Sequence, residues 1–90
     1  MEPQPFQSRY TIQVLAKTLD LLDVLGQTRA GLTLAELSKR LDLPKSSVFR
    51  YLVTLEARGY VERLPETDRY RLGLRLFEIG TLVASLFDVT

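Results

Sequence analysis

Hydrophobic positions in the first part of the chain recur at spacings of three and four, the period of an amphipathic helix. Between Thr11 and Gln27 they are Ile12, Leu15, Leu19, Leu22, Val24 and Leu25, and Gly26 marks the expected end of the helix. Residues 1–10 are mostly polar, contain two prolines and show no period, so we expect a flexible leader there. Residues 28–32 are expected to form a loop that runs into one or two extended residues.

A second and a third helix follow, separated by a tight turn. Thr33 and Glu36 have the spacing of a capping box, which satisfies unpaired N–H groups at the start of a helix. Pro44 disfavours a helical conformation at the residue before it and suits the first turn of a new helix. The third helix is predicted from Lys45 to Arg58, with Gly59 as its C-terminal stop. The residues expected to build this helix-turn-helix motif are Leu34, Leu37, Leu41, Pro44, Val48, Leu52 and Leu55.

After Gly59 the hydrophobic period changes from near 3.6 to 2. Residues 60–64 and 69–72 are short alternating runs joined by a Pro-Glu-Thr-Asp turn, which predicts a β-hairpin. Residues 74–87 return to a helical pattern. The order predicts a mainly α fold with a small β-hairpin: a winged helix-turn-helix domain at residues 11–73, followed by a linker helix at residues 74–90.

Composition narrows the possible functions. The 90 residues include no cysteine and no histidine, which removes disulfides, thiolate metal sites and the commonest general base. We therefore expect no metal, no cofactor and no enzymatic activity. No segment has the length and polarity of a membrane span or an export signal, which favours a cytoplasmic protein. The net charge is only +1, but residues 39–71 carry eight basic and five acidic side chains.

The predicted third helix carries chemistry that suits the major groove of duplex DNA. At about 100° per residue, Ser46, Arg50 and Val53 lie opposite the buried stripe. An arginine fork can bridge guanine O6 and N7, and short hydroxyl side chains can reach phosphates or base edges. The residues expected to bind DNA from this helix are Lys45, Ser46, Ser47, Phe49, Arg50 and Thr54.

Two alternatives remain open on this helix. The serines can cap the helix N-terminus, and Phe49 can either meet a thymine methyl or pack against Leu52.

The hairpin adds three arginines. Tyr70 and Leu72 are expected to point inward, so that Arg69 and Arg71 point outward, near Arg63. Arginines on a wing can neutralise phosphates without reading sequence. The alternative is ordinary surface pairing with Glu62, Glu66 and Asp68.

The run LTLAELSKRLDLPKSSVFRYLVTLEARGYV, from Leu32 to Val61, resembles the N-terminal domain of IclR-type bacterial transcription regulators. The hairpin run PETDRYRLG and the helix around residues 15–25 extend the resemblance to about residues 12–80. The family's Pro-Lys-Ser-Ser/Thr stretch is similar to residues 44–47, and its helix arginine to Arg50. Many members have histidine where this chain has Phe49, and glycine where it has Asp68.

The resemblance implies double-stranded DNA as the partner, with a roughly palindromic operator bound by a homodimer or higher oligomer. It also implies a larger domain, absent from this chain, that binds a small-molecule effector. The apolar stripe of residues 74–87 is then expected to pack on the first helix or on a partner subunit. Two rival functions stay in view: a winged-helix module that binds protein through the Ser46/Arg50 face, and a hydrolase that uses carboxylates such as Glu62 and Glu66.

Overall fold

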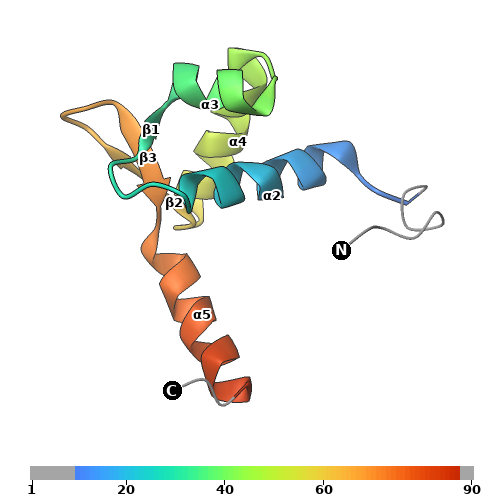
Figure 1. Ribbon diagram of the computed structural model, residues 1–90, viewed down its shortest axis with the longest axis vertical. Helices are drawn as coiled ribbons and strands as arrows, with labels where there is room; N and C mark the ends of the chain where they lie inside the picture. Colours follow the sequence, from blue (N-terminus) through green and yellow to red (C-terminus); the bar gives the residue numbers. More distant parts are fainter. Residues whose placement is uncertain (1–9, 88–90) are drawn as a thin grey trace.

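The computed structural model describes residues 10–87, so nearly all of the expected leader lies outside the described residues. Helices dominate the described part, with one small antiparallel sheet (Figure 1). In chain order the elements are α2 (Gln13–Leu25), β1 (Leu32–Thr33), α3 (Leu34–Leu41), α4 (Lys45–Ala57), β2 (Val61–Leu64), β3 (Arg69–Leu72) and α5 (Leu74–Leu86). This order confirms the mainly α winged-helix fold predicted from the sequence.

Helix α2 buries only its C-terminal half. Leu21 and Leu25 are fully buried, whereas Leu15 and Leu19 are 55% and 54% exposed. The predicted amphipathic helix is confirmed, but Leu15 and Leu19, which belong to its apolar positions, are not covered within this single chain. The reason is the position of α2, whose N-terminal half extends past the other helices (Figure 1). Gly26 is the C-cap, as predicted.

Helix α3 starts with the predicted capping box. The Thr33 Oγ1 atom accepts from the backbone N–H of Glu36 at 3.2 Å, and Glu36 Oε1 accepts from the N–H of Thr33 at 2.9 Å. The helix ends at Asp42, whose φ of 55° lies in the left-handed region that Asp tolerates. The Ser38 hydroxyl donates to the Leu43 carbonyl at 2.5 Å and holds the turn closed.

Helix α4 begins directly after Pro44, its N-cap residue. The predicted inner face is confirmed, because Val48 and Leu52 are fully buried and Leu55 is nearly so. The predicted stop at Gly59 is also confirmed, since Gly59 has a φ of 82° just after the helix end.

The sheet has three strands, in the order β1-β3-β2. The extended residues expected at the end of the 28–32 loop form β1, in which Leu32 pairs with Tyr70 and Thr33 with Arg69. Asp68 closes the hairpin turn with a φ of 55°, the left-handed conformation that glycine adopts most easily. The wing therefore forms without a glycine at that position.

The register of the hairpin corrects the predicted side of Arg63 and agrees with that of Leu72. Arg63 pairs with Tyr70, and directly paired residues project to the same face of a sheet. Arg63 therefore lies on the face of the buried Tyr70, and Arg69 and Arg71 lie on the other face. Leu72 pairs with the buried Val61 and lies on the inward face with Tyr70, as predicted, and it is 36% exposed because it stands at the end of β3.

One hydrophobic cluster connects α2, α3, α4 and the sheet. Its buried members are Leu21, Leu25, Leu32, Leu37, Leu41, Val48, Leu52, Leu55, Val61 and Tyr70. Leu34 is partly buried against this cluster, so all the leucine and valine residues predicted for the helix-turn-helix motif contribute to it. The cluster fixes α4 against α3 and leaves its opposite face free.

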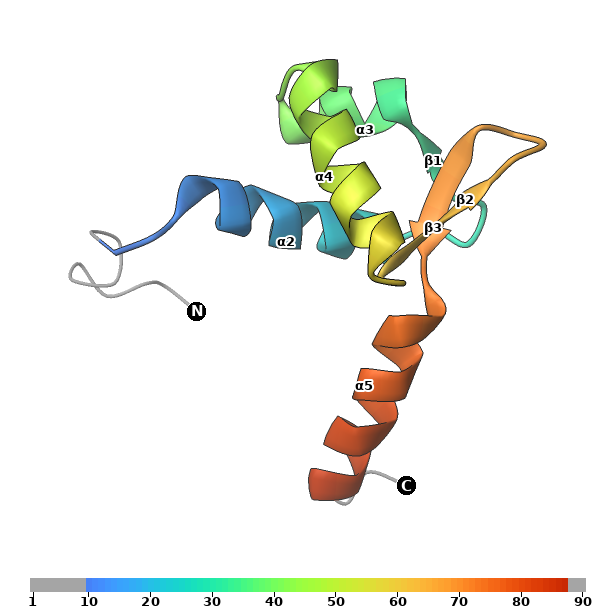
Figure 2. The same cartoon turned by 180° about the vertical axis from the view of Figure 1, so that it is seen from behind.

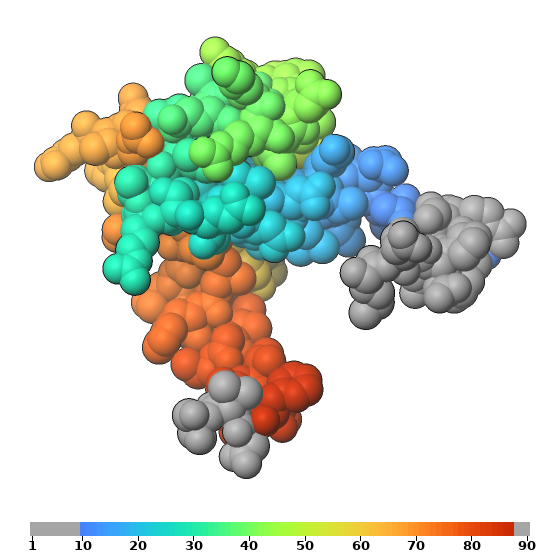
Figure 3. Space-filling view, viewed as in Figure 1, coloured from blue at the N-terminus to red at the C-terminus, as the bar shows by residue number. Residues whose placement is uncertain are grey.

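Helix α5 projects away from this body as a separate arm (Figures 1 and 3). None of its residues is buried, and Phe77, Leu82 and Leu86 are 68%, 66% and 82% exposed. Of the two expectations for its apolar stripe, burial against the first helix is not found among the described residues, and packing on a partner subunit stays a prediction.

Candidate nucleic-acid interface

The outer face of α4 presents unpaired polar side chains. Lys45, Ser46 and Arg50 are exposed, and among the described residues none of them has an ion pair or a side-chain hydrogen bond. A free guanidinium can offer its whole fork of donors to an acceptor such as the guanine edge. The α4 face predicted from the sequence is therefore exposed in the fold.

The N-terminus of α4 adds backbone donors to the same face. The first N–H groups of a helix have no acceptor within the helix, and no side chain caps this one. Ser46 and Ser47 therefore do not cap the helix, in contrast to the alternative left open by the sequence. The N–H groups of Lys45 and Ser46, together with the Lys45 ammonium, form a place suited to an anion such as a phosphate.

The other three predicted residues of α4 differ in their surroundings, and Ser47 is half-buried. Thr54 is exposed, but its hydroxyl donates to the Arg50 carbonyl at 3.1 Å, which leaves mainly its acceptor lone pairs for another partner. Phe49 is 50% exposed. Phe49 is therefore partly buried, as one of the two alternatives expects, and its contact with a thymine methyl stays a prediction.

Phe49 borders a hollow between α4, the start of α3 and the wing. The hollow is lined by Thr33, Leu34, Ala35, Lys45, Phe49, Arg63, Asp68 and Tyr70. Figure 2 shows α4 and the hairpin, with the tip of the hairpin projecting beyond the helices. Two cations of the hollow, Lys45 and Arg63, come from the helix and the wing respectively, so a polyanion lying along it can touch both elements.

The arginines of the wing are all paired with carboxylates. Arg63 bonds to Asp68, and Arg71 Nη2 lies 2.9 Å from Glu62 Oε1. The hydrogen bond and charge of Asp68 raise the pKa of Arg63, which keeps that guanidinium protonated. The pairing of Glu62 and Asp68 matches the alternative left open by the sequence, and the predicted phosphate contacts stay predictions.

Arg69 pairs with a residue that sequence reasoning missed. Its Nη1 atom lies 3.2 Å from Glu36 Oε1 and donates to the Gly31 carbonyl at 3.0 Å. Glu36 was recognised only as a capping residue. The sequence signal for this contact is the short extended segment before Glu36. This segment forms β1, which pairs with β3 and places Thr33 opposite Arg69.

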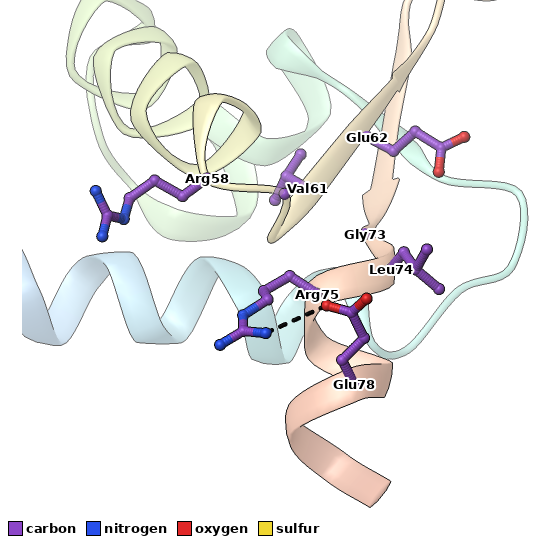
Figure 4. Close-up of a pocket in the computed structure, with 8 residues that line it drawn as sticks. Arg58, Val61, Glu62, Gly73, Leu74, Arg75 and Glu78 are labelled. Atoms are coloured by element: carbon purple, nitrogen blue, oxygen red, sulfur yellow. Dashed lines mark hydrogen bonds and ion pairs between the residues drawn. The ribbon is translucent and has the colours of Figure 1, made fainter.

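A second hollow lies at the root of α5 (Figure 4). It is lined by Arg58, Gly59, Val61, Glu62, Gly73, Leu74, Arg75 and Glu78. Its charges are mixed, and Arg75 and Glu78 pair with each other at 3.3 Å. Within residues 10–87 no cluster of three or more acidic side chains could hold a metal ion, and no helix is long and apolar enough to cross a membrane.

A helix-turn-helix with a free, donor-rich second helix beside a hairpin that carries three arginines defines the winged-helix class of DNA-binding domains. The comparison with protein families then specifies the family. The chain matches the family model described as the IclR helix-turn-helix domain over residues 14–65, more than half of its length, and it belongs to that family.

Relatives of the chain are transcription regulators. It is 35% identical over 78 residues to the HTH-type transcriptional regulator XynR of Escherichia coli, covering 87% of this chain and 31% of XynR. It is 37% identical over 80 residues to the HTH-type transcriptional regulator KdgR of Dickeya chrysanthemi, covering 88% of this chain and 26% of KdgR. The chain therefore spans less than a third of the length of these relatives.

Solved structures give the same result. An IclR transcriptional regulator from Alicyclobacillus acidocaldarius superposes with a TM-score of 0.78 at 32% identity, covering 86% of this chain and 31% of that one. The IclR of Thermotoga maritima gives a TM-score of 0.73 at 27% identity, covering 83% and 30%. These likenesses confirm the winged helix and the family resemblance predicted from the sequence.

Proposed function

We propose that this chain binds double-stranded DNA in a sequence-specific manner, as the DNA-reading part of a transcription regulator. The observation that carries the proposal is the outer face of α4, where Lys45, Ser46 and Arg50 are exposed and unpaired among the described residues. A buried inner face with Val48 and Leu52 presents this outer face rigidly. Rigid presentation lowers the cost of ordering side chains on binding.

Each residue of this face has a role that follows from its chemistry. Arg50 reads a guanine edge, and Lys45 with the helix N-terminus contacts a phosphate. Ser46, Ser47 and Thr54 contribute hydroxyl groups to phosphates or base edges, and the exposed half of Phe49 meets a thymine methyl.

The wing holds the DNA backbone through Arg63 and Arg71. Both side chains are about half exposed and paired with exposed carboxylates. Exposed ion pairs contribute little stability, so a phosphate can replace the carboxylate at small cost. These contacts raise affinity for all sequences alike.

We infer that the chain works as a homodimer on a palindromic operator, in the cytoplasm and without enzymatic activity of its own. The exposed apolar side chains of α2 and α5 support the dimer, because a second copy can cover them. Helix α5 is proposed as the linker to the rest of the protein, where an effector domain binds a small molecule. The greater length of the relatives XynR and KdgR supports the presence of such a further domain.

The test starts from duplexes that the wild-type chain enriches from a randomised library. We expect the enriched duplex to bind about a hundredfold or more tightly than a scrambled duplex, with both affinities falling as salt rises. Palindromic half-sites about one helical turn apart are expected from a dimer, and enrichment of a single half-site contradicts it. Equal, salt-insensitive binding to both duplexes contradicts DNA reading and favours a protein-binding module.

Arg50→Ala, with Arg58→Ala as the control, tests which residue reads sequence. Arg58 is an exposed arginine at the opposite end of the same helix. Arg50→Ala is expected to cost about 1–3 kcal/mol on the enriched duplex and to relax the preference at one base pair. Arg58→Ala should change the preference little. An equal loss on enriched and scrambled duplexes for Arg50→Ala would show that Arg50 does not read bases.

A further inference from the structure

Arg69 differs from the other two wing arginines in the location of its partners. Arg63 and Arg71 pair with carboxylates of the hairpin itself. Arg69 instead donates to the Gly31 carbonyl at 3.0 Å and to Glu36 Oε1 at 3.2 Å. It therefore connects the wing to the helix-turn-helix, which the pairs within the hairpin cannot do.

The acceptor of Arg69 is itself fixed in place. The same Oε1 atom of Glu36 accepts from the backbone N–H of Thr33 at 2.9 Å, within the capping box that starts α3. That backbone bond, with the nearby charge of Arg69, lowers the pKa of Glu36, so the carboxylate is ionised at neutral pH. One carboxylate thus serves both the start of α3 and the wing.

The backbone around this contact is tightly packed but short of hydrogen bonds. Strand β1 has two residues, so the ladder that joins the wing to α3 is minimal. Gly31 has a φ of 84°, and a Cβ atom there would lie 2.6 Å from the Tyr70 carbonyl oxygen. Arg69 reinforces the ladder with a side chain that reaches across it, and it is only 37% exposed.

We propose that Arg69 is a positioning residue, which sets the angle between the wing and the recognition helix α4 through Glu36, and is not a phosphate contact. The proposal rests on the DNA-binding function proposed above. DNA can contact α4 and the wing at the same time only at one angle between them. The apparent affinity therefore decreases when fewer molecules have that angle.

Glu36→Gln distinguishes a positioning role of Arg69 from a phosphate contact, because the two roles predict opposite changes in DNA affinity. Glutamine preserves the capping box but removes the charge that holds Arg69. A phosphate-binding Arg69 would be freed by this change, and the loss of a nearby negative charge would raise DNA affinity. A positioning Arg69 would lose its anchor, and affinity for the enriched duplex would fall by about threefold.

Arg69→Gln completes a double-mutant cycle. We expect about a tenfold loss from this variant, since it also gives up the bond to Gly31, and no further loss when Glu36→Gln is added. Arg71→Gln is the matched control, because it removes the same charge from the same strand without touching α3. It should show no coupling to Glu36→Gln.

A distance measurement tests the positioning without DNA. The chain has no cysteine, so spin labels can be attached through Glu66→Cys at the wing tip and Lys39→Cys on α3, both exposed. The distance distribution between the labels should broaden with Glu36→Gln or Arg69→Gln and stay narrow with Arg71→Gln. Circular dichroism of each variant checks that the fold is retained.

The outcomes are distinct. A broader distribution together with coupled affinity losses supports the positioning role. An unchanged distance distribution, or a rise in DNA affinity with Glu36→Gln, overturns the positioning role and favours a phosphate contact by Arg69. Failure of the unmodified chain to prefer any duplex counts against the proposed function, and the distance measurement then still decides whether Arg69 orients the wing.

Discussion

Residues of the same type in this chain have different roles because their partners differ. Arg50 is exposed and unpaired among the described residues, whereas Arg69 is held by Gly31 and Glu36. The helical period placed Arg50 on the outer face correctly, because a period needs only local geometry. The partners of Arg69 lie more than thirty residues earlier in the chain, and no local pattern contains them.

Gly73 shows how closely the backbone approaches at one position. A Cβ atom there would lie 2.3 Å from the Gly59 carbonyl oxygen and 2.9 Å from two further backbone atoms. The Gly73 N–H donates to the Tyr60 carbonyl at 2.8 Å, and the Arg75 N–H to the Gly59 carbonyl at 3.0 Å. The direction of α5 therefore depends on the absence of a side chain at position 73.

Gly73→Ala should lower the free energy of unfolding by about 1–3 kcal/mol, because the backbone must move apart to admit a methyl group. Gly80→Ala is the control. Gly80 lies inside α5 with nothing within 4 Å of its would-be Cβ, so alanine should raise helix content. Urea unfolding and circular dichroism measure both. A Gly73→Ala variant as stable as the wild type would contradict the close approach.

At the scale of elements, the sequence predicted the helices well and their burial less well. Capping residues and periods determine the ends of α3 and α4, and these signals are local. How much of the apolar stripe of α2 is buried depends on where the helix lies, so its period did not indicate that Leu15 and Leu19 stay exposed. Strand β1 has two residues and becomes a strand only by pairing with β3, so its sequence indicated no more than extended backbone.

The start of α3 should make stability depend on pH. In the folded chain the pKa of Glu36 lies below the ordinary 4.5, through its bond to the Thr33 N–H and the charge of Arg69. The unfolded chain therefore takes up the proton first as the pH falls. The contribution of Glu36 is fully present above about pH 4.5 and is lost as the pH falls through the lowered folded pKa.

Glu36→Gln should remove this dependence. Unfolding of the two chains at pH 7 and at several values below 4.5 should show a wild-type advantage that shrinks with acidity. Glu62→Gln, on an exposed carboxylate in the hairpin, is the control for a general charge effect. A constant difference at all pH values would contradict the ionised capping box.

The whole molecule joins a compact body to a projecting arm. The hydrophobic cluster holds α2, α3, α4 and the sheet together, while α5 leaves that body with none of its residues buried (Figure 3). Single-chain patterns cannot show whether a helical stripe is covered by its own chain or by another. The sequence therefore left two partners open for residues 74–87, the first helix and a second subunit, and burial on the first helix is not found within the described residues.

The most direct test of DNA reading is a map of the backbone amides by NMR as the enriched duplex is added to the chain. We expect the largest chemical-shift changes in residues 45–54 of α4 and in residues 63–71 of the wing. Changes concentrated in α2 or α5, with the outer face of α4 unaffected, would contradict DNA reading.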